Sequence, residues 1–185
     1  MNRHRQLTRL AHELLAADLQ VGDKAIDATA GNGHDVLFLA RQVAPEGLVY
    51  AFDVQQQALD NTRDRLQETG LCDIVTLCHT GHEEISTRVP RDWVGRVSAV
   101  TFNLGYLPGS DKQTTTQAHT TLQALEQSAE LLKPGGTLSI LAYRGHPGGV
   151  QEAQAVESWI HSQAGLACQT HESPGPVLYH CTKQV

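Results

Sequence analysis

The sequence predicts an α/β fold with a seven-stranded, mostly parallel sheet, one antiparallel strand and helices on both faces. Strand-like and helix-like segments alternate from Lys24 onward, which is typical of a doubly wound sheet. A turn with two glycines, Gly31 and Gly33, joins the first strand to a helix. The segment 172–176 between the last two strands is too short for a crossover helix and therefore predicts a hairpin.

Apolar runs bounded by turn residues give the strands, and apolar residues at helical spacing give the helices. The predicted strands cover residues 24–29, 48–53, 73–78, 97–103, 137–143, 166–172 and 177–183. The predicted helices cover residues 5–18, 34–43, 55–69, 114–132 and 150–164. Before the fifth strand, Pro134 is expected to end a helix, and Gly135 and Gly136 are expected to turn the chain.

The first twenty residues predict a helical segment that packs on a single domain covering residues 1–185. Leu7, Leu10, Leu14 and Leu15 recur at helical spacing, and a chain of 185 residues is too short for two ordinary domains. No apolar run is long enough to span a bilayer, and no secretory leader is recognised. We therefore expect a cytoplasmic protein that does not enter a membrane.

The charge balance argues against broad, nonspecific binding to nucleic acid. Fourteen Lys and Arg against 20 Asp and Glu give a formal net charge of −6. Binding to RNA needs only local patches, and two groups of arginines are candidates, with solvated surface arginines as the equally weighted alternative. These groups are Arg3, Arg5 and Arg9, and Arg88, Arg91 and Arg96.

Cysteine and histidine patterns predict no metal site. The four cysteines, Cys72, Cys78, Cys168 and Cys181, lack the close paired spacing of zinc ligands, so we expect buried free thiols. The ten histidines form no recognised metal-binding pattern.

The segment Asp27–Asp35 predicts a turn that binds a nucleoside cofactor. The following helix offers free N–H groups at its start, and Asp53 ends the next strand, where a carboxylate can accept hydrogen bonds from both ribose hydroxyls. Dinucleotide-binding turns need a third glycine, but Val36 stands there. Asp27 and Asp35 make the turn acidic, which favours the cationic S-adenosylmethionine (SAM) over NAD. Simple turn-forming glycines are the alternative.

The loop Asn103–Lys112, after the fourth strand, is the candidate for catalysis. It resembles the Asn-Pro-Pro-Tyr loop of many amino-group methyltransferases, with Leu104 and Gly105 in place of the prolines. The side-chain oxygen of Asn103 can accept a hydrogen bond from a target amine, and Tyr106 can stack on a base. Asp27, Asp111 or Tyr106 could accept the proton of the amine, and the sequence does not rank them. A turn-forming role for Asn103 is the alternative.

Three segments together resemble a bacterial family of class I SAM-dependent methyltransferases labelled "putative rRNA methylase". They are Asp27–Asp35, Asn103–Gly109 and Tyr143–Gly149, and the resemblance extends over nearly the whole chain. It implies the Rossmann-like class I methyltransferase fold, SAM as cofactor and a homodimer. The implied substrate is tRNA, contacted at the anticodon region. The implied reaction methylates the exocyclic amine of 5-aminomethyl-2-thiouridine at the wobble position.

The resemblance also implies site residues. Cofactor contacts are implied at Asp27, Ala28, Gly31, Asn32, Gly33, Asp53, His79 and His82. Contacts to the target amine are implied at Asn103, Tyr106 and Asp111, and substrate contacts at Tyr143, Arg144 and His146. One departure concerns the adenine contact. Methyltransferases often have an acidic residue directly after the third strand, whereas this chain has the turn His79–His82 followed by Glu83 and Glu84.

Two other functions remain open at this point. The same enzyme class could act on ribosomal RNA or on a small amine, which the acidic net charge permits. From a different class, a nucleotide-binding module without methyl transfer would also use the glycine turn, although the Asn103 loop argues against it.

Overall fold

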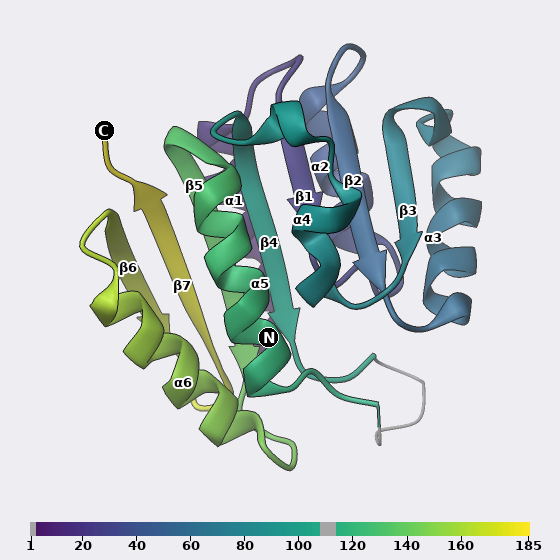
Figure 1. Ribbon diagram of the computed structural model, residues 1–185. Coiled ribbons are helices and arrows are strands. Elements are labelled where there is room, and N and C mark those ends of the chain that lie inside the picture. Colours follow the sequence, from purple (N-terminus) through teal and green to yellow (C-terminus); the bar gives the residue numbers. More distant parts are fainter. Residues whose placement is uncertain (1–2, 108–113) are drawn as a thin grey trace.

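The computed structural model describes residues 3–107 and 114–185 and contains a seven-stranded sheet in the order β3-β2-β1-β4-β5-β7-β6 (Figure 1). The strands are β1 Lys24–Asp27, β2 Leu48–Asp53, β3 Val75–His79, β4 Val97–Leu104, β5 Leu132–Tyr143, β6 Leu166–Glu172 and β7 Pro176–Lys183. Strand β7 is antiparallel to both of its neighbours, β5 and β6, and the other neighbouring pairs are parallel. The predicted sheet with one antiparallel strand is confirmed.

Helices cover both faces of the sheet, as predicted. They are α1 Arg3–Asp18, α2 His34–Val43, α3 Gln56–Thr69, α4 Ile85–Arg88, α5 Ala118–Leu131 and α6 Gly149–Ser162. In Figure 1, α4, α5 and α6 lie in front of the sheet and α1 and α2 behind it, with α3 packed beside α2. Because β4 is central and covered on both faces, nearly all of its residues are buried. Within the described ranges, no helix is long and apolar enough to cross a membrane.

The passage before the fifth strand differs from the prediction. Strand β5 begins at Leu132, which pairs with Val97, and the pairing resumes with Thr137 opposite Ala99. Residues 133–136 therefore form a bulge within the strand and not a separate turn before it. Pro134 has no N–H group for a sheet hydrogen bond, and Gly135 has a φ of +77°, so this sequence favours the bulge.

Helix α1 packs across β5 and β7. Leu7 and Ala11 are buried against Leu141 and Leu178, because apolar residues of α1 recur on the side that faces the sheet. At the end of the helix, Asp18 accepts a hydrogen bond of 2.7 Å from the Thr137 hydroxyl. These contacts fix α1 at both ends of its sheet-facing side.

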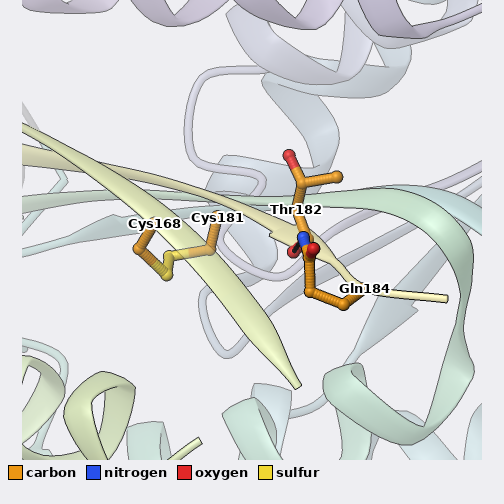
Figure 2. The surroundings of a disulfide bond; sticks show 4 residues. All are labelled: Cys168, Cys181, Thr182 and Gln184. Carbon is orange, nitrogen blue, oxygen red and sulfur yellow. Dashed lines mark hydrogen bonds between the residues drawn. A yellow bond between two sulfur atoms is a disulfide. The ribbon is translucent and has the colours of Figure 1, made fainter. Parts of the chain in front are cut away.

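The expectation of four free thiols is wrong for two of the cysteines. Cys168 and Cys181 lie directly opposite each other in β6 and β7 and form a disulfide bond (Figure 2). Cys72 and Cys78 are free and half-buried. The bond joins the two strands of the hairpin that sequence periodicity predicts.

Glu152 of α6 is a buried carboxyl group with two hydrogen-bond partners. Only 2% of its surface is exposed, and its two oxygens accept hydrogen bonds of 2.7 Å from Thr121 of α5 and from Thr116 in the preceding loop. The side chain therefore ties α6 to the start of α5.

Replacing Glu152 by alanine is expected to lower the free energy of unfolding by about 2 kcal/mol, since two threonine hydroxyls lose their acceptor. Urea denaturation measures this change, with Glu157→Ala on the exposed side of the same helix as the control. Equal stability of the two variants would contradict a role for Glu152 in holding the helices together.

Candidate active site

A cavity of about 820 Å³ lies at the carboxyl ends of the parallel strands, where ligands bind in open sheets of this kind. The residues after each of the strands β1 to β5 form its walls, and residues of the segment before α5 and of the β6–β7 turn complete the rim. Its volume lies within the usual range for small-molecule sites, roughly 300 to 1,000 Å³. Most of the residues singled out in the sequence meet here.

The turn after β1 depends on glycine for its shape. Gly31 and Gly33 have φ angles of +51° and +79°, and Gly33 caps the start of α2. A Cβ atom on Gly33 would lie 2.7 Å from Oγ1 and 2.9 Å from Cα of Thr62, so α3 leaves no room for a side chain. The Thr62 hydroxyl donates a hydrogen bond of 3.1 Å to the Gly31 carbonyl. Close packing of α3 against the turn thus holds its backbone in place.

Replacing Gly33 by alanine is expected to lower the free energy of unfolding by about 3 kcal/mol. The substitution combines a positive φ angle with a clash against α3. Gly70→Ala is the matched control, because Gly70 has a φ of +69° but nothing within 4 Å of an added Cβ. Thermal denaturation of both variants separates the effect of the clash from that of the positive φ angle. Equal losses of stability would show that close packing at Gly33 contributes nothing.

Asp53 organises two backbone segments at the end of β2. Its Oδ2 accepts a hydrogen bond of 2.9 Å from the Gly31 N–H, and its Oδ1 accepts one of 2.8 Å from the Gln55 N–H. Each carboxylate oxygen has a further lone pair, so Asp53 can still accept hydrogen bonds from the diol of a ribose. The carboxylate is therefore oriented before any ligand arrives.

Asp27 lies behind the cavity wall at the end of β1 and is fully buried. Its Oδ1 accepts a hydrogen bond of 3.0 Å from the Thr29 N–H, whereas Oδ2 has no hydrogen-bond partner among the described residues. Burial, followed by the charges of Asp35 and Asp53, raises the pKa of Asp27 well above its usual value. A cation placed in the cavity would reverse the effect of these charges and favour the ionised form.

Asn103, at the end of β4, is held on two sides. Its backbone N–H donates to the Thr29 hydroxyl at 2.7 Å, and its side-chain nitrogen donates to Asp35 Oδ2 at 2.6 Å. The other oxygen of Asp35 contacts Nε2 of His12, from α1, at 2.7 Å. Burial opposes ionisation of Asp35, but His12 and Asn103 hold its pKa below the usual value.

The loop after Asn103 pairs with the segment before α5. Tyr106 forms a β-bridge with Thr115, and the Gly105 carbonyl accepts a hydrogen bond of 3.0 Å from the Thr116 N–H. The Tyr106 ring meets the His146 ring edge to face, with 6.1 Å between the centroids. An added Cβ on Gly105 would lie 3.3 Å from the Tyr143 ring, so glycine allows the loop to lie close to β5.

Tyr143 and Arg144 form the β5 side of the cavity. Burial raises the pKa of Tyr143 to about 12, so the phenol stays protonated at neutral pH. Arg144 donates hydrogen bonds to the carbonyls of Ser173 and Gly175, at 2.6 and 2.9 Å, and lies 3.9 Å from Glu172. Arg144 therefore fixes the β6–β7 turn at the rim of the cavity.

His79, the last residue of β3, and His82, in the turn that follows, differ in position. His82 is buried with its ring edge to face against Phe102, and Nε2 has no hydrogen-bond partner among the described residues. Burial lowers the pKa of His82, which favours the neutral ring. His79 is exposed, contacts the Val54 carbonyl at 3.0 Å, and is not among the residues that line the cavity.

The cavity brings together most of the residues predicted from the sequence. Those that line it are Ala28, Gly31, Asn32, Asp53, His82, Asn103, Tyr106, Tyr143, Arg144 and His146. Asp27 and Gly33 lie behind the wall and shape it. Asp111 lies outside the described residues. Arg91 and Arg96 precede β4 and therefore lie at the opposite edge of the sheet, away from the cavity.

Sequence reasoning missed His12 and gave Asp35 no role beyond making the turn acidic. His12 lies on α1, 23 positions before Asp35, and only the packing of α1 on the sheet brings the two together. His12 also stacks on Phe38, with ring centroids 4.0 Å apart. The bias of the turn toward acidic residues is the one sequence signal that points to this cluster.

The residues around the cavity fit a cationic nucleoside better than a pyrophosphate. Asp35 and Asp53 give this region negative charge, and Asp27 Oδ2 is a buried oxygen without a donor among the described residues. A sulfonium or ammonium group is favoured beside such carboxylates, whereas phosphate groups would be repelled. Within residues 3–107 and 114–185, no cluster of three or more His, Cys, Asp or Glu could hold a metal ion.

In a comparison with protein families, the chain matches the family described as "Putative rRNA methylase". The match covers residues 49–171, from the second residue of β2 to the next-to-last residue of β6. It thus includes the Asn103 loop and the β5 side of the cavity.

Individual relatives agree with this match. A chloroplastic "tRNA (mnm(5)s(2)U34)-methyltransferase" of Arabidopsis thaliana is 40% identical over 166 residues, which are 84% of this chain and 59% of the plant protein. The chain thus spans little more than half the length of that relative.

Two solved structures are similar over nearly their full lengths. A "putative rRNA-methylase" from Clostridium thermocellum has a TM-score of 0.89 and 33% identity, with 96% of this chain and 97% of that chain covered. A "putative methyltransferase" from Streptococcus mutans, solved in complex with SAH, has a TM-score of 0.84 and 35% identity, with 95% and 97% covered.

Proposed function

Because the chain belongs to the family described as "Putative rRNA methylase", we propose that it is a SAM-dependent N-methyltransferase acting on a modified wobble uridine of tRNA. The proposed reaction converts 5-aminomethyl-2-thiouridine to 5-methylaminomethyl-2-thiouridine. The observation that carries this proposal is the 40% identity, over 84% of the chain, to a plant enzyme named for this methyl transfer.

The cofactor is proposed to occupy the side of the cavity beneath the β1 turn. Asp53 would bind the ribose hydroxyls, the backbone of Ala28, Gly31, Asn32 and Gly33 would shape the sugar site, and His82 would lie by the adenine. Asp27 would provide negative charge near the cationic end. When bound, SAM supplies an electrophilic methyl group. SAH in the Streptococcus mutans structure, which is 35% identical, supports this assignment. His79 is also proposed as a cofactor contact, from the family resemblance, although it is not among the residues that line the cavity.

The target amine is proposed to bind at Asn103. The amide oxygen of Asn103 would accept one N–H of the amine and direct its lone pair, because in-line methyl transfer depends mainly on close approach and aim. Tyr106 would stack on the uracil ring, and Tyr143, Arg144 and His146 would contact the substrate. Asp111 is proposed as one acceptor of the amine proton.

The partner and assembly are proposed as follows. The substrate contact is the anticodon region of tRNA, and the enzyme acts as a homodimer in the cytoplasm, where tRNA is used. Disulfide bonds are uncommon in that compartment. Cell fractionation combined with thiol labelling of Cys168 and Cys181 therefore tests the location independently of activity.

Parallel methylation assays test the proposed substrate. Purified protein with SAM is incubated with tRNA bearing 5-aminomethyl-2-thiouridine, with the same tRNA lacking the aminomethyl group, with ribosomal RNA and with the free nucleoside. Methylation of the first substrate alone is expected. The name of the matching family favours ribosomal RNA as the second candidate, and methylation of that RNA alone would replace the tRNA proposal. Tight binding of NAD with none of SAM, by calorimetry, would remove both.

A further inference from the structure

We propose that His12 and Asp35 are positioning residues that fix the side-chain amide of Asn103 in the orientation needed to hold the methyl-accepting amine. This inference rests on the proposed function of Asn103. It assigns a part in the reaction to α1, which carries none of the residues proposed above.

The three side chains form a continuous chain of hydrogen bonds that ends at the cavity. His12 Nε2 contacts Asp35 Oδ1 at 2.7 Å, and Asn103 Nδ2 donates to Asp35 Oδ2 at 2.6 Å. Both oxygens of one carboxylate are thus engaged, one by α1 and one by β4. Asp35 and Asn103 are both among the residues that line the cavity.

The chemistry of the carboxylate decides which way the amide of Asn103 faces. An ionised carboxylate only accepts hydrogen bonds, so the nitrogen of the Asn103 amide must face Asp35 and the oxygen must face away from it. In this orientation the amide presents an acceptor to the amine. In the reverse orientation an N–H group would donate to the amine lone pair and block the electrons that attack the methyl group.

His12 keeps Asp35 in the form that imposes this choice. A protonated Asp35 could donate a hydrogen bond and would then tolerate either amide orientation. Burial opposes ionisation of Asp35, whereas His12, Asn103 and His34 favour it, and the net pKa of Asp35 is lowered. Stacking on Phe38, with an angle of 1° between the rings, fixes the His12 ring.

Three single variants test the inference. Asp35→Asn is expected to lower kcat about 100-fold, because a misdirected group at a positioning site costs roughly that factor. His12→Ala is expected to lower kcat about 10-fold. His12→Gln should recover most of this loss, since its amide can donate to Asp35. The KM for tRNA should stay within about twofold of wild type in all three variants, and so should the calorimetric Kd for SAM in the two His12 variants, which keep the charge of Asp35. Glu13→Gln, in an exposed ion pair on the same helix, is the control.

A double variant separates positioning from a general structural role. In the Asn103→Ala background there is no amide to orient, so Asp35→Asn should cost less than about twofold further in kcat. Full additivity of the two losses would overturn the inference, as would equal losses for His12→Gln and His12→Ala. If wild type methylates tRNA but Asp35→Asn has normal kcat, the positioning role alone fails. If wild type methylates no aminomethyluridine tRNA, the proposed function itself fails.

Discussion

Replacing Asn103 by alanine is expected to lower kcat for methyl transfer by about 100- to 1,000-fold, with little change in the affinity for SAM. Losses of this size follow when a preorganised hydrogen-bonding group at the reacting atom is removed. The variant keeps the backbone hydrogen bond to Thr29, so the path of β4 should be preserved. Single-turnover kinetics with aminomethyluridine tRNA measure the chemical step, and calorimetry measures the binding of SAM.

Ser98→Ala is the matched control for this experiment. Ser98 is buried in the same strand, and its hydroxyl donates to Asp23 at the opposite edge of the sheet. Its loss should reduce stability without changing kcat. A kcat near wild type for Asn103→Ala would remove the proposed amine site from the end of β4.

Replacing Asp53 by alanine is expected to weaken the binding of SAM about 100-fold, which corresponds to about 2.7 kcal/mol. The variant loses the acceptor proposed for the ribose, and the N–H groups of Gly31 and Gln55 lose their partner. Hydrogen bonds to a charged group contribute about 1.5 to 3 kcal/mol each, so the loss of one net contact to the ligand gives this magnitude. Calorimetric titrations with SAM and with SAH measure it.

Asp60→Ala is the control for charge. Asp60 lies on the neighbouring helix α3, pairs with Arg63 at 2.9 Å, and is not among the cavity-lining residues. The same change of net charge there should leave the Kd for SAM unchanged. Equal affinity of the Asp53 and Asp60 variants would show that the ligand does not use the carboxylate at the end of β2.

Within the described part of the chain, apolar periodicity predicts all seven strands and five of the six α-helices. Strands β2 and β6 and helix α2 begin and end at the predicted residues. The missing helix, α4, has only four residues, too few for a periodic pattern to be recognised. The bulge in β5 was missed because a proline followed by two glycines is typical of a turn, whereas here sheet pairing continues on both sides of it.

The candidate site is predictable where it depends on strand ends and not where it depends on packing between distant elements. Asp53 and Asn103 follow directly from the rule that the carboxyl ends of parallel strands share one edge. His12 reaches Asp35 only because α1 lies across β5 and β7, which no local pattern reveals. The Cys168–Cys181 bond is only partly predictable. The sequence predicts the hairpin, but the two cysteines face each other only because the register places Glu172 opposite Val177.

The position of β7 has a consequence for the order in which the protein forms during synthesis. Strand β7 leaves the ribosome after β6, yet it lies between β5 and β6. Until it emerges, β6 has no neighbour to pair with, and the nascent chain exposes the unpaired edge of β5. The turn that Arg144 anchors at the cavity rim forms in the same late step. A nascent chain therefore cannot form a finished cavity before β7 has been inserted.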